Sequence, residues 1–278
     1  TTEDINKGIV IVDNAITYDN GQATGTVPDF NEYVWVPIPE SNNFKSTAWN
    51  GPYWNGSSWT TGEHPIAIAP TTDEEKLNKY WDDSTTQEYQ DMIDSVEHYK
   101  GFYIGRYEAS EGTGSVAQSK RNVSTWTDVP QTTAITACTN NTKTPNMHLI
   151  YGIEWDSTLN WLKDNATISS STEGETKTMD ISDIQNDSRS WGNYSNSTGD
   201  AAANSGSKQH TGASEYWKAN NIYDLVGNVY EWTQEKYSTG TYRAYRGGGY
   251  SSDGDSYPAA YRSSNNESPT FNYYVRVP

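Results

Sequence analysis

Residues 221–232, with the sequence NIYDLVGNVYEW, combine the residue types and spacing best suited to binding a cation. Asp224 and Glu231 stand on either side of Gly227, and a glycine permits a turn that brings main-chain carbonyls beside the two carboxylates. Carboxylate and carbonyl oxygens are the ligands that a hard cation such as calcium prefers. Trp232 and the apolar residues before it are expected to pack inward. The alternative is that Glu231 forms a salt bridge or caps a loop and that no metal binds.

Residue types for catalysis are dispersed along the chain. The four histidines, at positions 64, 98, 148 and 210, lack the spacing of metal ligands, so surface or packing roles are expected for them. The sequence contains no Gly-x-Ser-x-Gly, phosphate-binding loop or His-Glu-x-x-His motif. The single cysteine, Cys138, excludes an intrachain disulfide and a cysteine-based metal cluster, and a buried structural thiol is expected.

The last 42 residues, 237–278, differ in composition from the rest of the chain. They contain eight Tyr, seven Ser, five Gly and three Asn, and four Arg against two Asp and one Glu give them a net charge of +1. Tyr offers a large amphipathic contact area at low entropy cost, and Ser, Gly and Asn adapt their hydrogen bonds. This composition is typical of binding loops and predicts a ligand-binding region. A tyrosine-rich strand edge without a ligand is the alternative.

The charge and hydropathy of the whole chain exclude several classes of partner. A net charge of −17 argues against nucleic acid, which is bound through basic surfaces, and against anionic membrane surfaces. No apolar run of 18 residues occurs, so membrane insertion is not expected. The first residues show no signal peptide, which leaves open a cytoplasmic protein, a removed signal, or export by another route such as virion assembly.

The elements that must position these residues are short. Alternating or buried-type strands are predicted at 8–12, 33–38 and 101–108, and apolar residues at helical spacing predict helices over 86–99, 133–140 and 154–163. Residues 167–190 are polar with little periodicity, so an exposed insertion is expected there. No repeat or clear linker is visible, and a single domain is expected over 1–278, with an N-terminal strand extension at 1–30.

Four motifs occur in the second half of the chain: YDLVGNVYEW at 223–232, RGG at 246–248, YR at 261–262 and VRV at 275–277. Together they resemble the formylglycine-generating-enzyme (sulfatase-modifying factor) family, and pieces at 34–37, 102–108 and 154–155 fall in that family's order. The resemblance spans about residues 30–278. It implies an α+β, C-type-lectin-like fold with small twisted sheets, few helices and much ordered loop. It also implies a structural calcium site whose ligands are Asp224, the carbonyls of Gly227 and Val229, and Glu231.

The enzymes of this family use a pair of cysteines, which this chain lacks. The second follows the Tyr-Arg motif and the first lies five residues earlier, and here these positions hold Ser263 and Pro258. Neither residue can replace a thiolate as a ligand for copper. We therefore expect no copper and no oxidase activity, and an enzyme is the less favoured alternative.

One branch of the family fits the composition of the tail: the variable proteins of diversity-generating retroelements, in which adenines of AAC-like codons are mutated. Tyr, Ser, Asp, Asn, Phe and Gly can be reached in this way, whereas Lys, Met, Trp and Gln cannot, and the tail contains none of these four. Glu267 cannot be reached either and is expected to be scaffold. The branch implies a protein displayed on a virion or cell surface that binds a protein or glycan on another cell or virion. A lectin-like surface module of fixed specificity is the alternative.

The residues predicted to contact the ligand are selected from the polar and aromatic residues of the tail that such mutation can supply, and Tyr261 is expected to be scaffold. They are Tyr242, Tyr245, Tyr250, Ser251, Ser252, Asp253, Asp255, Ser256, Tyr257, Ser263, Ser264, Asn265, Asn266, Phe271, Tyr273 and Tyr274.

Overall fold

The structure is a computed structural model of the chain. It describes residues 7–13, 17–19, 22–24, 30–41, 44–48, 52–54, 59–61, 64–65, 80–141, 144, 146–163, 165–237, 241–266 and 273–275. The helices are α2 (Gln87–Tyr99), α3 (Gln131–Thr139), α4 (Gly152–Leu162), α5 (Ile181–Gln185) and the 3-10 helix η3 (Gly199–Ala202). The strands are β1 (Val10–Val12), β2 (Thr17–Asp19), β3 (Gln22–Thr24), β4 (Glu32–Pro37), β5 (Thr47–Ala48), β6 (Pro52–Trp54), β7 (Trp59–Thr61), β8 (His64–Pro65), β9 (Tyr80–Trp81), β10 (Gly101–Gly105), β11 (Ala109–Gly112), β12 (Val116–Ser119), β13 (Thr167–Ser169), β14 (Thr176–Thr178), β15 (Lys218–Ala219), β16 (Ile222–Tyr223), β17 (Tyr230–Tyr237), β18 (Tyr242–Arg246), β19 (Arg262–Asn266) and β20 (Tyr273–Val275).

A three-stranded sheet in the order β1-β4-β10 forms the first half of the core. Alternation along β4 turns Val34 and Val36 toward the main hydrophobic cluster and Tyr33 toward a second cluster. Pro37 is the last residue of β4, where its missing N–H removes no central hydrogen bond. The sheet therefore separates two apolar layers. Its strands confirm those predicted at 8–12, 33–38 and 101–108, although the third ends at Gly105.

Helix α2 begins and ends where its sequence predicts. Thr86 is the N-cap, and its side-chain oxygen accepts the backbone N–H of Tyr89. Tyr89, Met92 and Val96 recur at helical spacing and are buried, whereas Tyr99 is 67% exposed. Lys100 ends the helix in the left-handed conformation, with φ of 63°.

Helix α4 is buried along nearly its whole length, and the carboxyl group of a remote residue fixes its start. Asp82 accepts the backbone N–H groups of Gly152 and Ile153, each at 2.8 Å, so two of the unpaired donors of the first turn are satisfied. Within the turn, Glu154 accepts the backbone N–H of Tyr151 at 2.9 Å. This capping links the segment before α2 to the centre of the molecule.

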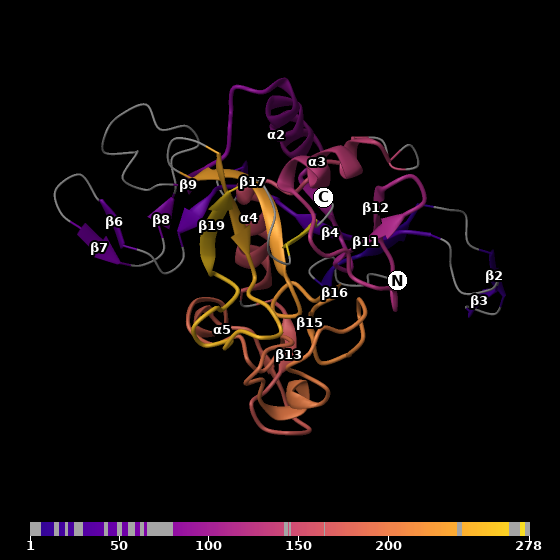
Figure 1. The fold of residues 1–278 in the computed structure, drawn as a ribbon, viewed down its shortest axis with the longest axis vertical. Coiled ribbons are helices and arrows are strands. Elements are labelled where there is room, and N and C mark those ends of the chain that lie inside the picture. The colour runs from indigo at the N-terminus through magenta and orange to yellow at the C-terminus, as the bar shows by residue number, and fades with distance from the viewer. Residues whose placement is uncertain are drawn as a thin grey trace.

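A five-stranded sheet carries the C-terminal motifs, with β19, β18, β17 and β20 side by side and β9 paired with the end of β17 (Figure 1). Helix α3 packs near β17 and β20, and helix α4 packs against β17 on the other side. Trp232 belongs to the cluster under α3, whereas Trp155 belongs to the main cluster around α4. We call the two surfaces of this sheet the α3 side and the α4 side.

The region 167–190 differs from its prediction as an exposed insertion. It contains β13, β14 and α5, and three of its apolar residues, Ile168, Met179 and Ile184, are buried in the main cluster. Their irregular spacing among polar residues has no period of two or 3.6, so periodicity could not reveal them. The predicted helices at 133–140 and 154–163 are confirmed as α3 and α4, with boundaries shifted by one or two residues.

Within the described residues, no helix has the length and apolar character needed to span a bilayer.

Candidate ligand-binding face

The register of β17, β18 and β19 determines which side chains share a surface. Trp232 lies opposite Tyr245, and Tyr245 lies opposite Ser263. Directly opposed residues project from the same face of a sheet, so these three side chains lie on the α3 side. By the same rule Arg246 and Arg262, which are also paired, lie on the α4 side.

Four tyrosine rings form a contiguous cluster on the α3 side, beside the part that Trp232 and α3 fill. The ring centroids of Tyr230 and Tyr245 are 5.1 Å apart, and those of Tyr257 and Tyr261 are 4.7 Å apart. Contacts of 6.3 Å join the two pairs. All four rings are half-buried, so each keeps surface available for contact. We call these four residues the tyrosine cluster.

The hydroxyl groups of Tyr230 and Tyr261 stay protonated at neutral pH. Desolvation by burial is the main cause that raises the pKa of Tyr230 and of Tyr261 to about 12. The Tyr230 hydroxyl is hydrogen-bonded to Ser252 Oγ at 2.7 Å. These two residues therefore present neutral rings whose hydroxyls can both donate and accept hydrogen bonds.

Side chains from an earlier segment hold the loop between β18 and β19. Ser195 Oγ donates to Asp253 Oδ1 at 2.7 Å, and Asn196 Nδ2 donates to Asp255 Oδ1 at 3.3 Å. Arg189 lies 3.6 Å from the second oxygen of Asp255. Asp253 and Asp255 are exposed, but part of their bonding capacity is used to fix the loop.

Tyr194 supports this loop from the interior of the molecule. It is fully buried, and its hydroxyl donates to the carbonyl of Gly247 at 2.8 Å and lies 2.9 Å from that of Tyr257. Gly248 has φ of +77°, and a Cβ there would lie 2.6 Å from the Tyr257 carbonyl oxygen, so a glycine is required. The motif RGG at 246–248 thus lets the chain pass close to the loop that presents Tyr257.

A buried ionic layer joins β17, β18 and β19 to α4. Arg246 binds Asp156 at 2.6 Å and Glu235 at 3.1 Å, and Arg262 binds the same two carboxylates at 2.6 and 2.9 Å. Arg246, Asp156 and Glu235 are at most 1% exposed. Such a layer fixes the register of the three strands, because a shifted strand would leave charges buried without partners.

The structure places most of the predicted contact residues at the surface. Six are exposed: Tyr242, Ser251, Asp253, Asp255, Ser256 and Asn266. Seven are half-buried: Tyr245, Tyr250, Ser252, Tyr257, Ser263, Ser264 and Asn265. Tyr273 and Tyr274 lie in β20, and Phe271 lies outside the described residues. None of the thirteen residues in the first two groups is buried.

The strand register divides these residues between the two sides of the sheet. Tyr245, Ser263 and Asn265 lie on the α3 side, whereas Tyr242, Ser264 and Asn266 have the parity of Arg246 and lie on the α4 side. The ring of Tyr242 contacts Tyr237 at 6.3 Å, away from the tyrosine cluster. The expected single surface is therefore limited to the α3 side and the loop between β18 and β19.

Two scaffold residues belong to the face, although the contact predictions omit them. Tyr230 precedes the tail, and Tyr261 lies within the Tyr-Arg motif. Ring contacts place both inside the tyrosine cluster. The only sequence signal was the tyrosine at each of these positions.

The segment with the predicted calcium ligands is tightly wound and buried. Asp224 is 1% exposed and Glu231 is 0% exposed, and Asp224 Oδ2 accepts the backbone N–H of Gly212 at 2.6 Å. The donor set, two buried carboxylates with the carbonyls of Gly227 and Val229, suits calcium in kind. Binding of calcium by these residues stays a prediction.

Clusters of metal-binding side chains do not occur elsewhere in the described part of the chain: no group of three or more His, Cys, Asp or Glu is arranged to hold an ion. The predicted calcium site has only two such side chains. Gly227 has φ of +72°, and a Cβ there would lie 2.4 Å from the carbonyl oxygen of Asn193, so this turn accepts only glycine.

Asn228 is the polar centre of this segment, a role that the sequence does not reveal. Its side chain donates to Glu108 Oε2 at 2.5 Å and accepts from Asn193 Nδ2 at 3.0 Å and from the backbone N–H of Gln209 at 2.9 Å. Its carbonyl oxygen accepts the N–H of Tyr250 at 2.8 Å. Asn228 thus ties the loop before β15 to the loop beside the tyrosine cluster.

The positions of the family's two cysteines lie next to the tyrosine cluster. Pro258 is buried, and its carbonyl accepts the N–H of Tyr261 at 2.8 Å, while Ser263 is half-buried in β19. Cys138 is buried in α3, as predicted, and burial raises the pKa of its thiol well above the usual value. A thiol without thiolate character at neutral pH is a poor nucleophile.

Comparisons with known proteins agree with this architecture. Residues 83–274 match the model of the sulfatase-modifying factor enzyme 1-like domain. Nine solved chains match, among them PvdO from Pseudomonas aeruginosa, at 12% identity over 94% of this chain and 98% of that chain, with a TM-score of 0.46. No curated protein sequence matches. The family match, together with few helices and small antiparallel sheets, confirms the predicted α+β, C-type-lectin-like fold.

Proposed function

This chain belongs to the sulfatase-modifying factor enzyme 1-like family, and we propose that it is a ligand-binding member whose contact surface is the tyrosine cluster with the loop beside it. The ligand is a protein or a glycan on another cell or virion. The protein acts from a virion or cell surface, and its C-terminal face differs between copies of the gene through a diversity-generating retroelement.

The tyrosine cluster carries this proposal. Its rings come from β17, β18 and the turn before β19, and they pack on one another and beside Trp232. Rings held in this way lose little side-chain freedom on binding, and their hydroxyls add directional hydrogen bonds. Exposed Ser251 and Ser256 lie in the adjoining loop and supply adaptable hydrogen-bonding groups.

Diversification is supported by the separation of scaffold from surface. Trp232, Tyr194, Arg246 and Asp156 are fully buried, whereas the thirteen described contact residues all have some exposure. Folding is only marginally favourable, so a face that tolerates many side chains cannot supply much of the core. The tail also lacks Lys, Met, Trp and Gln, the residues that mutation of adenines in AAC-like codons cannot supply.

An oxidase of the kind found in the family's enzymes is disfavoured. Pro258 and Ser263 occupy the positions of the paired cysteines, and Cys138 lies buried elsewhere. Copper titration and a peptide-thiol oxidation assay test this directly. Tight copper binding with turnover of a cysteine peptide would overturn the assignment as a non-enzyme.

Sequencing the 3′ end of the gene in many isolates tests diversification. We expect substitutions at Tyr245, Tyr257 and residues 250–256, with residues 221–232 constant, and a reverse transcriptase gene with an imperfect repeat nearby. A constant tail would support the second candidate, a lectin-like surface module of fixed specificity.

Variants of the face test the binding surface itself. The probe is a phage-displayed peptide library. We expect Tyr245→Ala and Tyr257→Ala to abolish the peptide hits that the wild-type chain gives, and Tyr99→Ala, an exposed tyrosine on α2, to retain them. Equal effects of all three variants would show that the tyrosine cluster is not the contact surface.

The structural calcium of the proposal would be held by Asp224, Glu231 and the carbonyls of Gly227 and Val229, and it would stiffen the turn beneath the face. A ligand that binds only the native state raises stability with its concentration. We expect calcium to raise the melting temperature relative to EDTA, and Glu231→Gln to remove that increase. An unchanged melting temperature would argue for a metal-free turn.

A further inference from the structure

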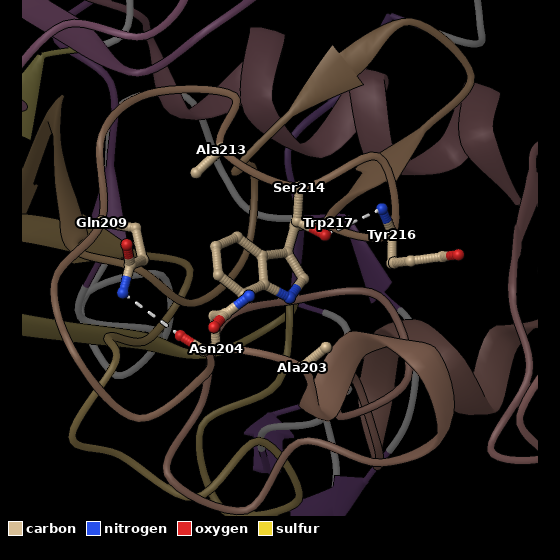
Figure 2. Close-up of a pocket in the computed structure, with 7 residues that line it drawn as sticks. All are labelled: Ala203, Asn204, Gln209, Ala213, Ser214, Tyr216 and Trp217. Carbon is tan, nitrogen blue, oxygen red and sulfur yellow. Dashed lines mark hydrogen bonds between the residues drawn. The ribbon is translucent and has the colours of Figure 1, made fainter.

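A second concave site lies away from the tyrosine cluster, in the loop before β15. This pocket has a volume of about 230 Å³, and its lining residues all lie between positions 203 and 217 (Figure 2). In the figure Gln209 and Tyr216 lie on opposite sides of the Trp217 indole, with Asn204 below it. None of the lining residues belongs to the tail, so the pocket does not depend on the proposed diversification.

The residues of the family motif hold the backbone of this pocket. Asn228 accepts the N–H of Gln209 at 2.9 Å, and its Nδ2 lies 3.3 Å from the Gln209 carbonyl oxygen. Asp224 accepts the N–H of Gly212 at 2.6 Å, and Trp217 Nε1 donates to the carbonyl of Ala201 at 2.8 Å. The wall is therefore formed before any ligand arrives, which reduces the entropy lost on binding.

The polar groups of the pocket are neutral and can donate and accept at once. The Asn204 carboxamide forms no hydrogen bond within the described part of the chain. Gln209 uses its amino group on Ser207 Oγ at 2.8 Å and on the Asn204 carbonyl at 3.2 Å, which leaves its amide oxygen as an acceptor. Paired donors and acceptors of this kind match the vicinal hydroxyls of a sugar.

Charged ligands have no partner in this pocket. No lining residue carries a charge. The neighbouring Glu215 is already engaged by Arg121 and Lys218, each at 2.6 Å. A carboxylate, phosphate or ammonium group placed here would lose its hydration without gaining an ion pair.

The volume of the pocket and the exposure of its aromatic side chains further limit the kinds of ligand that it can bind. The volume lies below the about 300 Å³ at which pockets for drug-sized ligands begin, so a single ring fits and an oligomer does not. Trp217 is only 1% exposed, so it closes the floor but offers no face on which a nucleobase could stack. Tyr216, at 43% exposure, can contact the C–H groups of a ring at the rim.

From these observations we propose that the pocket at residues 203–217 binds one neutral sugar ring, independently of calcium and of the tyrosine cluster.

Saturation-transfer NMR on the full chain tests this inference. The probes are glucose, galactose and N-acetylglucosamine, with glucuronic acid as the charged comparison. The variants are Asn204→Gly, because Asn204 has φ of 64° and glycine keeps that conformation, and Gln209→Ala, because Asn228 holds only the backbone of that residue. The matched control is Gln87→Ala, a glutamine on the exposed surface of α2.

We expect saturation transfer to at least one neutral sugar, in EDTA as in calcium. Asn204→Gly or Gln209→Ala should weaken binding about three- to tenfold, the usual effect of removing one hydrogen bond, and Gln87→Ala should not. The absence of transfer to every neutral sugar, equal transfer to glucuronic acid, or unchanged binding in both pocket variants would overturn the proposal. Loss of transfer in Tyr245→Ala with retention in Asn204→Gly would show that the sugar binds at the tyrosine cluster, and this result would also refute the proposal.

Discussion

Replacing Trp232 tests whether the fold is independent of the face that it carries. Trp232 is 0% exposed, packs in the cluster under α3, and donates its indole N–H to the Val129 carbonyl at 2.9 Å. Removing a fully buried tryptophan side chain costs about 3 to 5 kcal/mol in unfolding free energy. Trp232→Phe keeps an aromatic ring but loses the hydrogen bond, for which about 1 to 3 kcal/mol is expected because a buried carbonyl is left unpaired.

Ser251 and Ser256 provide the matched surface change. Both are exposed, and no hydrogen bond of their side chains occurs within the described residues. The double variant Ser251→Ala/Ser256→Ala should therefore change stability by no more than about 0.5 kcal/mol. Ser252 differs from them, since its hydroxyl bonds Tyr230, and Ser252→Ala should cost on the order of 0.5 to 1.5 kcal/mol.

Equilibrium urea unfolding measures all four variants. The midpoint should shift most for Trp232→Ala, less for Trp232→Phe, less again for Ser252→Ala, and least for the serine double variant. The slope should stay unchanged, since an altered slope would report a change in the surface exposed on unfolding. If the serine double variant loses as much stability as Trp232→Ala, the division between scaffold and face is refuted.

Three further predictions concern the buried scaffold. Burial, reinforced by Glu235, raises the pKa of Asp82 to about 8, so between about pH 4 and pH 8 the native state holds a proton that the unfolded chain has lost. The stability that this group contributes is complete at low pH and is lost as pH rises through that window, by about 1.4 kcal/mol of unfolding free energy per pH unit. In urea unfolding, the free energy of unfolding should therefore depend less on pH for Asp82→Asn than for the wild-type chain. Arg246→Met leaves buried carboxylates with one cation fewer and should cost about 3 to 5 kcal/mol by the same assay, so a neutral effect would show that the ionic layer is not needed. Tyr194→Phe should cost about 1 to 3 kcal/mol and speed amide hydrogen exchange in residues 249–257, whereas unchanged exchange there would contradict the support assigned to this hydroxyl.

Local patterns in the sequence predicted the helices well, because their signals are confined to one or two turns. Tyr89, Met92 and Val96 define the buried stripe of α2, and Thr86 marks its start. The buried residues of 167–190 were missed because they are held by contacts with distant strands and not by a repeating pattern. Ile184, for example, lies in α5, a helix of only five residues with too few turns to show a period.

The candidate face was predicted in composition but not in geometry. The tail's content of Tyr, Ser and Asn indicated a binding region, yet the pairing of Tyr245 with Ser263 decides which of these side chains project together. That pairing, and the bonds from Ser195 and Asn196 to the loop, join residues far apart in the chain. Composition and spacing carry no information about such contacts.

Asn228 forms two kinds of hydrogen bond, and they respond differently to substitution of the residues around them. Its carboxamide supports the backbone of the loop that forms the pocket, whereas its main-chain oxygen supports Tyr250. A main-chain bond survives substitution of either partner's side chain. Residues near Tyr250 can therefore be substituted while the pocket at residues 203–217 keeps its shape. Asn228 can thus support a constant surface and a variable surface at the same time.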